Sequence, residues 1–151
     1  MRRIMLLVAM FTLVAAACSS DDPTFSDAPI DTQPPAATAD AIEADDQTSD
    51  GTSLIVSEVT IVDSPGFVVI HRDADGAPGG VVGHVAIPQG TSLEVAVPFD
   101  EPVESGDYWP MLHVDAGEAG TYEFPGADVP VTDAEDNVVM VQITLTVEDA
   151  G

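Results

Sequence analysis

Histidine and methionine are the residues of this chain best suited to bind a metal ion. Two apolar runs end alike, since "GFVVIHRDADG" (66–76) and "MLHVDAGEAG" (111–120) share the pattern His-x-Asp-Ala. Imidazole nitrogen and thioether sulfur are ligands that suit copper. One hypothesis is therefore a copper site assembled from the following residues: His71, His84 and His113, with Met111 or Met140.

Strand direction argues against that site. If successive strands alternate in direction, the strand at 66–72 runs opposite to the strand at 107–115, and their last residues lie at opposite ends of the fold. This predicts that His71 and His113 are far apart. His84 is expected on the face of its own strand that carries Val82 and Ala86. The alternative is that the histidines are independent, and that the repeated ending marks two strand exits.

Calcium is the second metal hypothesis, because calcium prefers oxygen ligands. Asp73 and Asp75 precede Gly76, and Asp115 lies two residues after His113. The stretch "TDAEDN" at 132–137 adds three further acids, Asp133, Glu135 and Asp136. None of these matches a twelve-residue calcium-binding loop. The alternative is that Asp and Gly form the turns, through side-chain to backbone hydrogen bonds and positive φ angles.

Enzymatic chemistry finds little support. The chain has no serine flanked as in a nucleophile elbow, and the glycine-rich "GAPGGVVG" at 76–83 lacks the lysine of a phosphate-binding loop. Its acids are spread over every loop, as on a solvated surface, rather than matched as an acid and base pair. We therefore expect a protein that is not an enzyme.

Charge restricts the partners. The sequence has 27 acids and three basic residues, two of which, Arg2 and Arg3, lie at the extreme N-terminus, so Arg72 stands alone in the rest of the chain. Such a surface repels nucleic acids and anionic lipid headgroups. Cations, basic proteins or a very salty medium remain as partners or surroundings.

The N-terminus has the features of an export signal. Residues 1–17 have a basic start, an apolar run too short for a comfortable membrane span and then small residues. The stretch "LVAAACSS" resembles a bacterial lipoprotein signal, which implies that Cys18 is lipidated and anchors the mature protein to a membrane of the cell envelope. An ordinary secretory signal is the alternative. Because Cys18 is the only cysteine, no disulfide can form within the chain.

The domain follows a spacer. Residues 18–51 are rich in acids and proline and hold one aromatic residue, which predicts a disordered tether. From residue 52 to residue 151 the composition changes to runs of β-branched residues separated by Pro, Gly and Asp. This stretch has the length of one domain.

An all-β fold is expected for 52–151, because apolar and polar residues alternate in short runs and no helical period is sustained. About seven strands in about 100 residues predict an antiparallel, immunoglobulin-like β-sandwich without a disulfide. Trp109 is a candidate core aromatic, and Pro110 places the start or an edge of a strand there. The expected strands are 53–62, 66–72, 80–87, 92–99, 107–115, a short one at 120–126, and a long one at 137–148.

The order "DGTSLIVSEVTI", "GFVVIH", "VVGH", "MLHVDAG…YEFPG" and "VVMVQITLTVE" resembles a domain of unknown function found in exported haloarchaeal and bacterial proteins. The resemblance covers 47–148 and implies a sandwich-like fold with no established activity. His84 stands where a small polar residue is expected in that family. The expected function is a membrane-tethered, extracytoplasmic, non-enzymatic module with a binding or structural role, and the alternative is a lipoprotein that binds copper or calcium.

Overall fold

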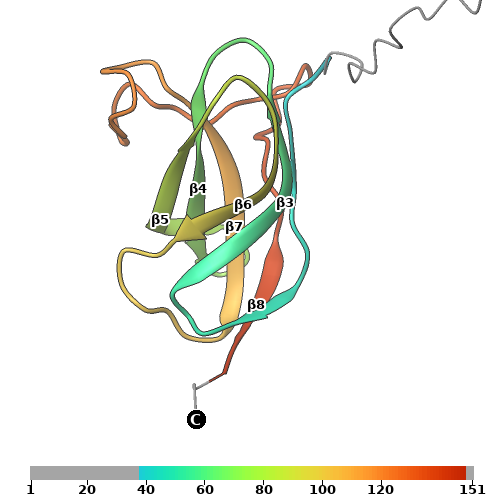
Figure 1. Ribbon diagram of the computed structural model, residues 1–151, viewed down its shortest axis with the longest axis vertical. Helices are drawn as coiled ribbons and strands as arrows, with labels where there is room; N and C mark the ends of the chain where they lie inside the picture. The colour runs from blue at the N-terminus through green and yellow to red at the C-terminus, as the bar shows by residue number, and fades with distance from the viewer. Residues whose placement is uncertain (1–37, 149–151) are drawn as a thin grey trace, which may run out of the picture. The chain divides into compact units, whose positions relative to one another are not determined.

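The computed structural model describes residues 38–148, and this part of the chain contains eight β-strands (Figure 1). Most of them coincide with runs of β-branched residues bounded by Gly, Pro or Asp, as strand propensity requires. They are β1 (Ala41–Glu43), β2 (Gln47–Ser49), β3 (Ser53–Ile61), β4 (Gly66–Asp73), β5 (Pro78–Ile87), β6 (Gly90–Pro98), β7 (Gly106–Val114) and β8 (Ile143–Val147).

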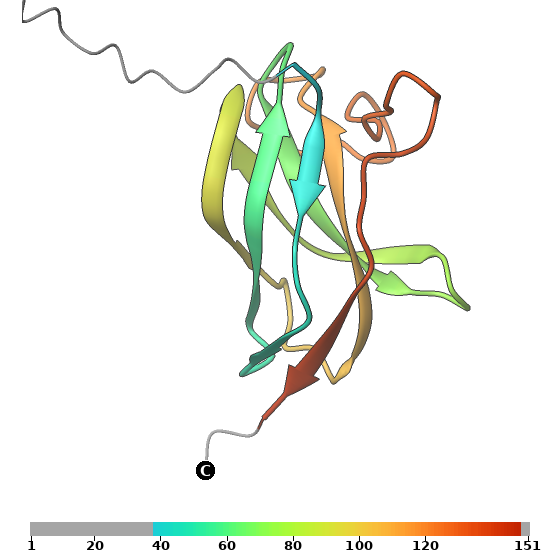
Figure 2. The ribbon, with the colours of Figure 1, turned by 90° about the vertical axis from the view of Figure 1, so that its right-hand side faces the viewer.

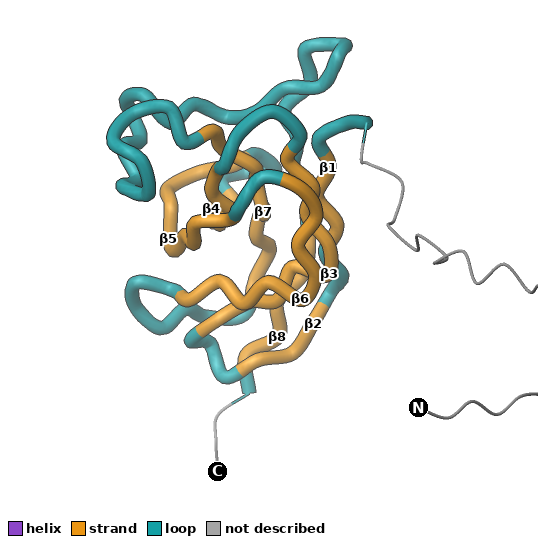
Figure 3. The backbone as a smooth tube through the Cα atoms, turned by 45° about the horizontal axis from the view of Figure 1, so that its top comes forward, coloured by secondary structure: helices purple, strands orange, loops and turns teal. Residues whose placement is uncertain are grey.

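The strands form two sheets. One has the order β1-β3-β6 and the other the order β2-β8-β7-β4-β5, and Figure 3 shows β4, β5 and β7 side by side in one layer. Strands β3 and β6 share one sheet while β4, β7 and β8 share the other, which is the arrangement of the immunoglobulin fold. The expected all-β sandwich is confirmed.

The core lies between the two sheets and is built by alternation along each strand. In β3 Leu54 and Val56 are fully buried, and in β4 Val68 and Ile70 point the same way into the core. Strand β8 adds Ile143 and Leu145 from the C-terminal end of the chain. In β6 the alternation of buried and exposed residues is less strict, because Leu93, which alternation places on the buried face with Val97, is 65% exposed.

Tyr108 is the core aromatic of β7, and the expectation for Trp109 is wrong. The Tyr108 hydroxyl donates to the backbone oxygen of Glu104 at 2.8 Å, the tyrosine corner that immunoglobulin-like domains form at this point. Trp109 points to the opposite face of the sheet and is partly exposed, and its Nε1 donates to Asp73 at 2.9 Å.

Pro110 lies in the middle of β7, a strand with neighbours on both sides, and not at its start. The backbone oxygen of Pro110 accepts from the amide of Val141, so the proline nitrogen faces the same side. On that side β8 pairs only with residues 106–108, and the chain beyond it is irregular. The ladder with β4, where Ile70 is paired with Pro110, therefore needs no donor from the proline.

The domain begins earlier than its composition predicts. Strand β1 pairs antiparallel with β3, and β2 pairs parallel with β8, so residues 41–49 belong to the two sheets and not to a disordered tether. Pairing with longer strands supplies the stability that these short acid-rich stretches cannot supply themselves. The earlier part of the predicted tether, 18–37, lies outside the described residues.

Two expected strands differ in the structure. Residues 120–126 form turns, and the long strand expected at 137–148 is reduced to β8, preceded by isolated bridges such as that between Met111 and Met140. The expected signal and Cys18 lie outside the described residues. Nothing in residues 38–148 is a helix long and apolar enough to cross a membrane.

Candidate functional site

A second buried layer lies on the outer face of the five-stranded sheet, the face turned away from the core. Along β4, Phe67, Val69 and His71 are buried but alternate with the residues that point into the core. The segment between β7 and β8, residues 115–142, covers part of this face. Figure 2 shows that this segment and the β4–β5 hairpin project to the same side of the sandwich.

An irregularity in β5 brings His84 to this outer face. Val69 pairs with His84 and Ile70 with Gly83, but the next pair is His71 with Val81, so Val82 is an extra residue. One extra residue reverses which side chains face the core. Val82 is consequently in the core while His84 is on the outer face, which corrects the expectation that these two share a face.

His71 and His113 lie together on the outer face, and the prediction that they are far apart is wrong. Strands β4 and β7 do run antiparallel, and His71 is paired with Trp109, four residues before His113. Both imidazoles nevertheless lean along the sheet toward each other, and their ring centres are 5.8 Å apart. We call these two residues the histidine pair.

Backbone carbonyls hold both rings of the histidine pair in one tautomer. His71 Nδ1 lies 2.7 Å from the oxygen of Gly79, and His113 Nδ1 lies 2.8 Å from the oxygen of Asp128. A carbonyl oxygen only accepts, so each Nδ1 carries the proton and donates. In the neutral ring Nε2 then carries the lone pair, and both Nε2 atoms are buried without a hydrogen-bond partner in the described part of the protein.

Burial keeps His113 neutral. The side chain is fully buried, and desolvation holds the pKa of His113 below its ordinary value, with the nearby His71 acting in the same direction. The hydrogen bond to Asp128 opposes this shift without reversing it. A neutral imidazole with a free Nε2 is the form that binds metal ions.

Two aromatic side chains from the 115–142 segment cover the histidine pair. The Phe124 ring centre is 5.0 Å from that of His113 and 6.2 Å from that of His71, edge-on in both cases. Tyr122 stacks on His84 at 4.5 Å and lies 5.2 Å from Phe67. Burial raises the pKa of Tyr122 to about 12, so its hydroxyl stays protonated. The two aromatic side chains over the pair therefore bring no charge to it.

Asp128 holds this cover in place. Its carboxylate accepts from the amide of Ala116 at 3.0 Å and from the amide of Glu123 at 2.6 Å, which ties the two ends of the loop together. These backbone donors, Ala116 foremost, hold the pKa of Asp128 below its usual range. The same residue supplies the carbonyl that orients His113, so one aspartate both closes the loop and positions a histidine.

Met111 belongs to the same buried layer. It lies two residues before His113 in β7, is only 5% exposed, and is paired with Val69, the residue between Phe67 and His71 on the outer face of β4. Met140 forms a bridge with Met111 but is 36% exposed. The structure therefore brings together His71, His113 and Met111 in neighbouring positions, with His84 one aromatic ring away.

The carboxylates singled out for calcium serve as turn residues in the structure. Asp73 accepts from the amide of Gly76 and from Trp109, and Asp75 has a left-handed φ of 58°. Asp133 accepts from the amides of Glu135 and Asn137.

Asp115 accepts from the amide of Gly120 at 2.7 Å through one oxygen, and its other oxygen is buried without a partner. Within residues 38–148 no three His, Cys, Asp or Glu side chains form a group that could hold a metal ion. Any third protein ligand to the histidine pair must therefore be of another type.

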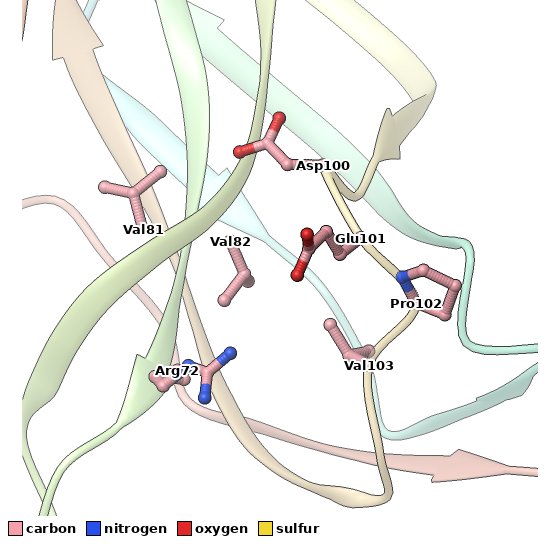
Figure 4. A pocket seen from close by; sticks show the side chains of 7 residues that line it. All are labelled: Arg72, Val81, Val82, Asp100, Glu101, Pro102 and Val103. Carbon is pink, nitrogen blue, oxygen red and sulfur yellow. The ribbon is translucent and has the colours of Figure 1, made fainter.

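A separate hollow of about 340 Å³ lies between β5 and residues 100–103, which follow β6 (Figure 4). It is lined by Arg72, by the acids Asp100 and Glu101, and by Val82 and Val103 among others. Two acids accompany the single arginine, so the site does not favour an anionic ligand.

Sequence reasoning did not identify Tyr122, Phe124 or Asp128 as parts of a site. The stretch "GTYEFPGAD" reads as an ordinary edge strand followed by a turn, and no local pattern says that it folds over another strand. The cluster of aromatics next to a Pro-Gly turn is the only local sign.

The domain is thus an immunoglobulin-like β-sandwich that carries a buried histidine pair under an aromatic cover. A family model, the domain of unknown function DUF7282, matches residues 40–146, and the chain belongs to that family. The match confirms the resemblance to a domain of unknown function. No curated protein and no solved structure gives a significant match to the chain.

Proposed function

We propose that this chain is a lipid-anchored, non-enzymatic module of the cell envelope that binds a transition-metal ion between His71 and His113. The observation that carries the metal function is the pair of buried Nε2 atoms without partners. Metal-ligating histidines commonly donate their other ring nitrogen to a carbonyl or carboxylate, as both do here.

The separation of the rings supports a shared ion. Metal–nitrogen bonds are about 2.0–2.1 Å long, which puts the centres of two imidazoles on one ion roughly 5–6 Å apart. The 5.8 Å between the ring centres falls in that range.

Binding by the full-length chain in detergent tests the metal function. We expect about one ion per chain, and a loss of affinity of about tenfold or more in His71→Gln and His113→Gln, at least the loss caused by removing an outer partner of a ligand. His84→Gln is the matched control, because His84 shares the layer but is outside the pair. Equal affinities in all three variants, or no binding by the native chain, would contradict the proposal.

Ring nitrogen resonances give a second readout, since the chain has three histidines. Metal should shift the Nε2 signals of His71 and His113 and leave that of His84 in place. A shift confined to His84 would place the ion elsewhere.

The anchor is supported by the basic start, the apolar run and the small residues before Cys18. We expect Cys18→Ser to move the protein from the membrane fraction to the soluble fraction. Ser19→Ala is the control that retains the cysteine. A Cys18→Ser variant that stays in the membrane would refute lipid anchoring.

A further inference from the structure

We infer that the histidine pair is a site for monovalent copper, with the Met111 thioether as the third ligand. This inference rests on the proposed metal function and specifies its ion and its ligands. Three observations carry it: the lack of a carboxylate free to bind an ion beside the pair, the donor types within reach, and the place of Met111 in the layer.

The surroundings favour an ion of low charge. The pair has an aromatic cover, and the one fully buried carboxylate nearby, that of Asp128, is already occupied by the amides of Ala116 and Glu123. Moving an ion out of water costs more as its charge rises, unless opposite charge compensates. A site without an available carboxylate therefore accepts a monovalent ion more readily than a divalent one.

The donor types argue against zinc. Structural zinc sites use four ligands, and catalytic zinc sites use three protein ligands from His, Cys, Asp and Glu. No such group of three exists in residues 38–148. Thioether sulfur is a soft ligand that selects monovalent copper, and a low coordination number suits that ion.

Met111 has the required position. It lies on the outer face of β7 next to His113 on that face, and its partner Val69 is next to His71 on the outer face of β4. Diagonal neighbours in a sheet are about 7–8 Å apart, within reach of a long side chain. Met111 is buried with the pair, whereas Met140 is considerably more exposed.

Competition with a chromogenic copper(I) chelator under reducing, oxygen-free conditions tests the inference on the full-length chain in detergent. We expect one copper(I) per chain, and an affinity for zinc(II) that is far lower. Met111→Leu should weaken copper(I) binding by about tenfold or more, as losing even an outer-shell partner does. Met140→Leu is the matched control and should bind as the native chain does.

X-ray absorption at the copper edge provides a readout that a mere packing role would not move. A sulfur ligand should be seen in the native chain and in Met140→Leu, and should be lost in Met111→Leu. If metal binds through the two histidines without sulfur, or if zinc(II) binds as tightly as copper(I), the inference fails while the proposed function stands. If no metal binds, both fail.

Discussion

Replacing both members of the histidine pair by leucine should leave the metal-free domain nearly as stable as before. The double variant, His71→Leu with His113→Leu, removes two buried Nε2 atoms that have no partners. It also deprives the carbonyls of Gly79 and Asp128 of their donors. Two polar atoms are thus without a protein partner before the change and two after it, and one of the latter belongs to the half-buried Gly79, so the largest costs cancel.

The remaining difference is small. Two hydrogen bonds of roughly 1 kcal/mol each are lost, and additional apolar volume is buried in a layer already lined by Phe67 and Phe124. We expect the free energy of unfolding, measured with a chelator present, to change by less than about 2 kcal/mol. By contrast, Leu112→Ala in the core should cost about 2–5 kcal/mol, because it leaves a cavity.

Metal should stabilise the native chain but not the double variant. At a free ion concentration a hundred times the dissociation constant, binding stabilises the native chain by about 2.7 kcal/mol, which raises Tm by roughly 10 °C for a domain of this size. The double variant should gain nothing. Thermal unfolding followed by far-UV circular dichroism, with chelator and with metal, measures both. A loss above about 4 kcal/mol with chelator present would refute the reasoning, because it would mean that the pair is structural.

Three further substitutions test the contacts that stabilise the β-sandwich. Tyr108→Phe should lose the corner bond to Glu104 and about 1 kcal/mol in urea unfolding, and an unchanged midpoint would contradict that role. Gly83→Ala should cost about 1–3 kcal/mol, because its methyl group would meet the backbone oxygen of Pro98; native stability would mean that β5 and β6 separate easily. Hydrogen bonds, that from the Asn137 side chain foremost, lower the pKa of Asp133 in the folded protein. The ionised Asp133 therefore stabilises the fold above its unfolded pKa, and this stabilisation is lost as pH falls. Asp133→Asn should match the native chain in acid but be less stable at pH 7. A stability difference that does not vary with pH would contradict this.

Much of the fold could be predicted because its signals are local. Long β-branched runs bounded by Gly, Pro and Asp place β3 to β7 to within two residues at each end. Strands β1 and β2 were missed because each is three residues long and is held by a partner far away in the sequence. The acid-rich stretch in which they lie predicts disorder, and only the pairing with β3 and β8 overrides that prediction.

The site was harder to predict because it depends on non-local geometry. Strand direction places the C-terminal ends of β4 and β7 at opposite ends of the sheet, and the antiparallel pairing of their backbones agrees with this. It says nothing about which face each histidine occupies or which way its ring leans. The extra residue at Val82 also reverses the face of His84, and no feature of "GVVGHVAI" announces it.

The repeated His-x-Asp-Ala pattern marks the ends of two strands and also the place where two histidines meet. Each aspartate opens a turn, since Asp73 accepts from the amide of Gly76 and Asp115 from the amide of Gly120. The first turn leads into β5, where the carbonyl of Gly79 meets His71, and the second opens the 115–142 segment, where the carbonyl of Asp128 meets His113.

The two endings are therefore separate strand exits that perform the same task at one place. In each, the chain that follows the aspartate brings a carbonyl to Nδ1, and Nε2 is buried without a partner in the described part of the protein. One such histidine is accounted for by packing alone. Two that lean toward each other from neighbouring strands, each donating Nδ1 to a carbonyl as metal-ligating histidines commonly do, are the observation on which the proposed metal function rests.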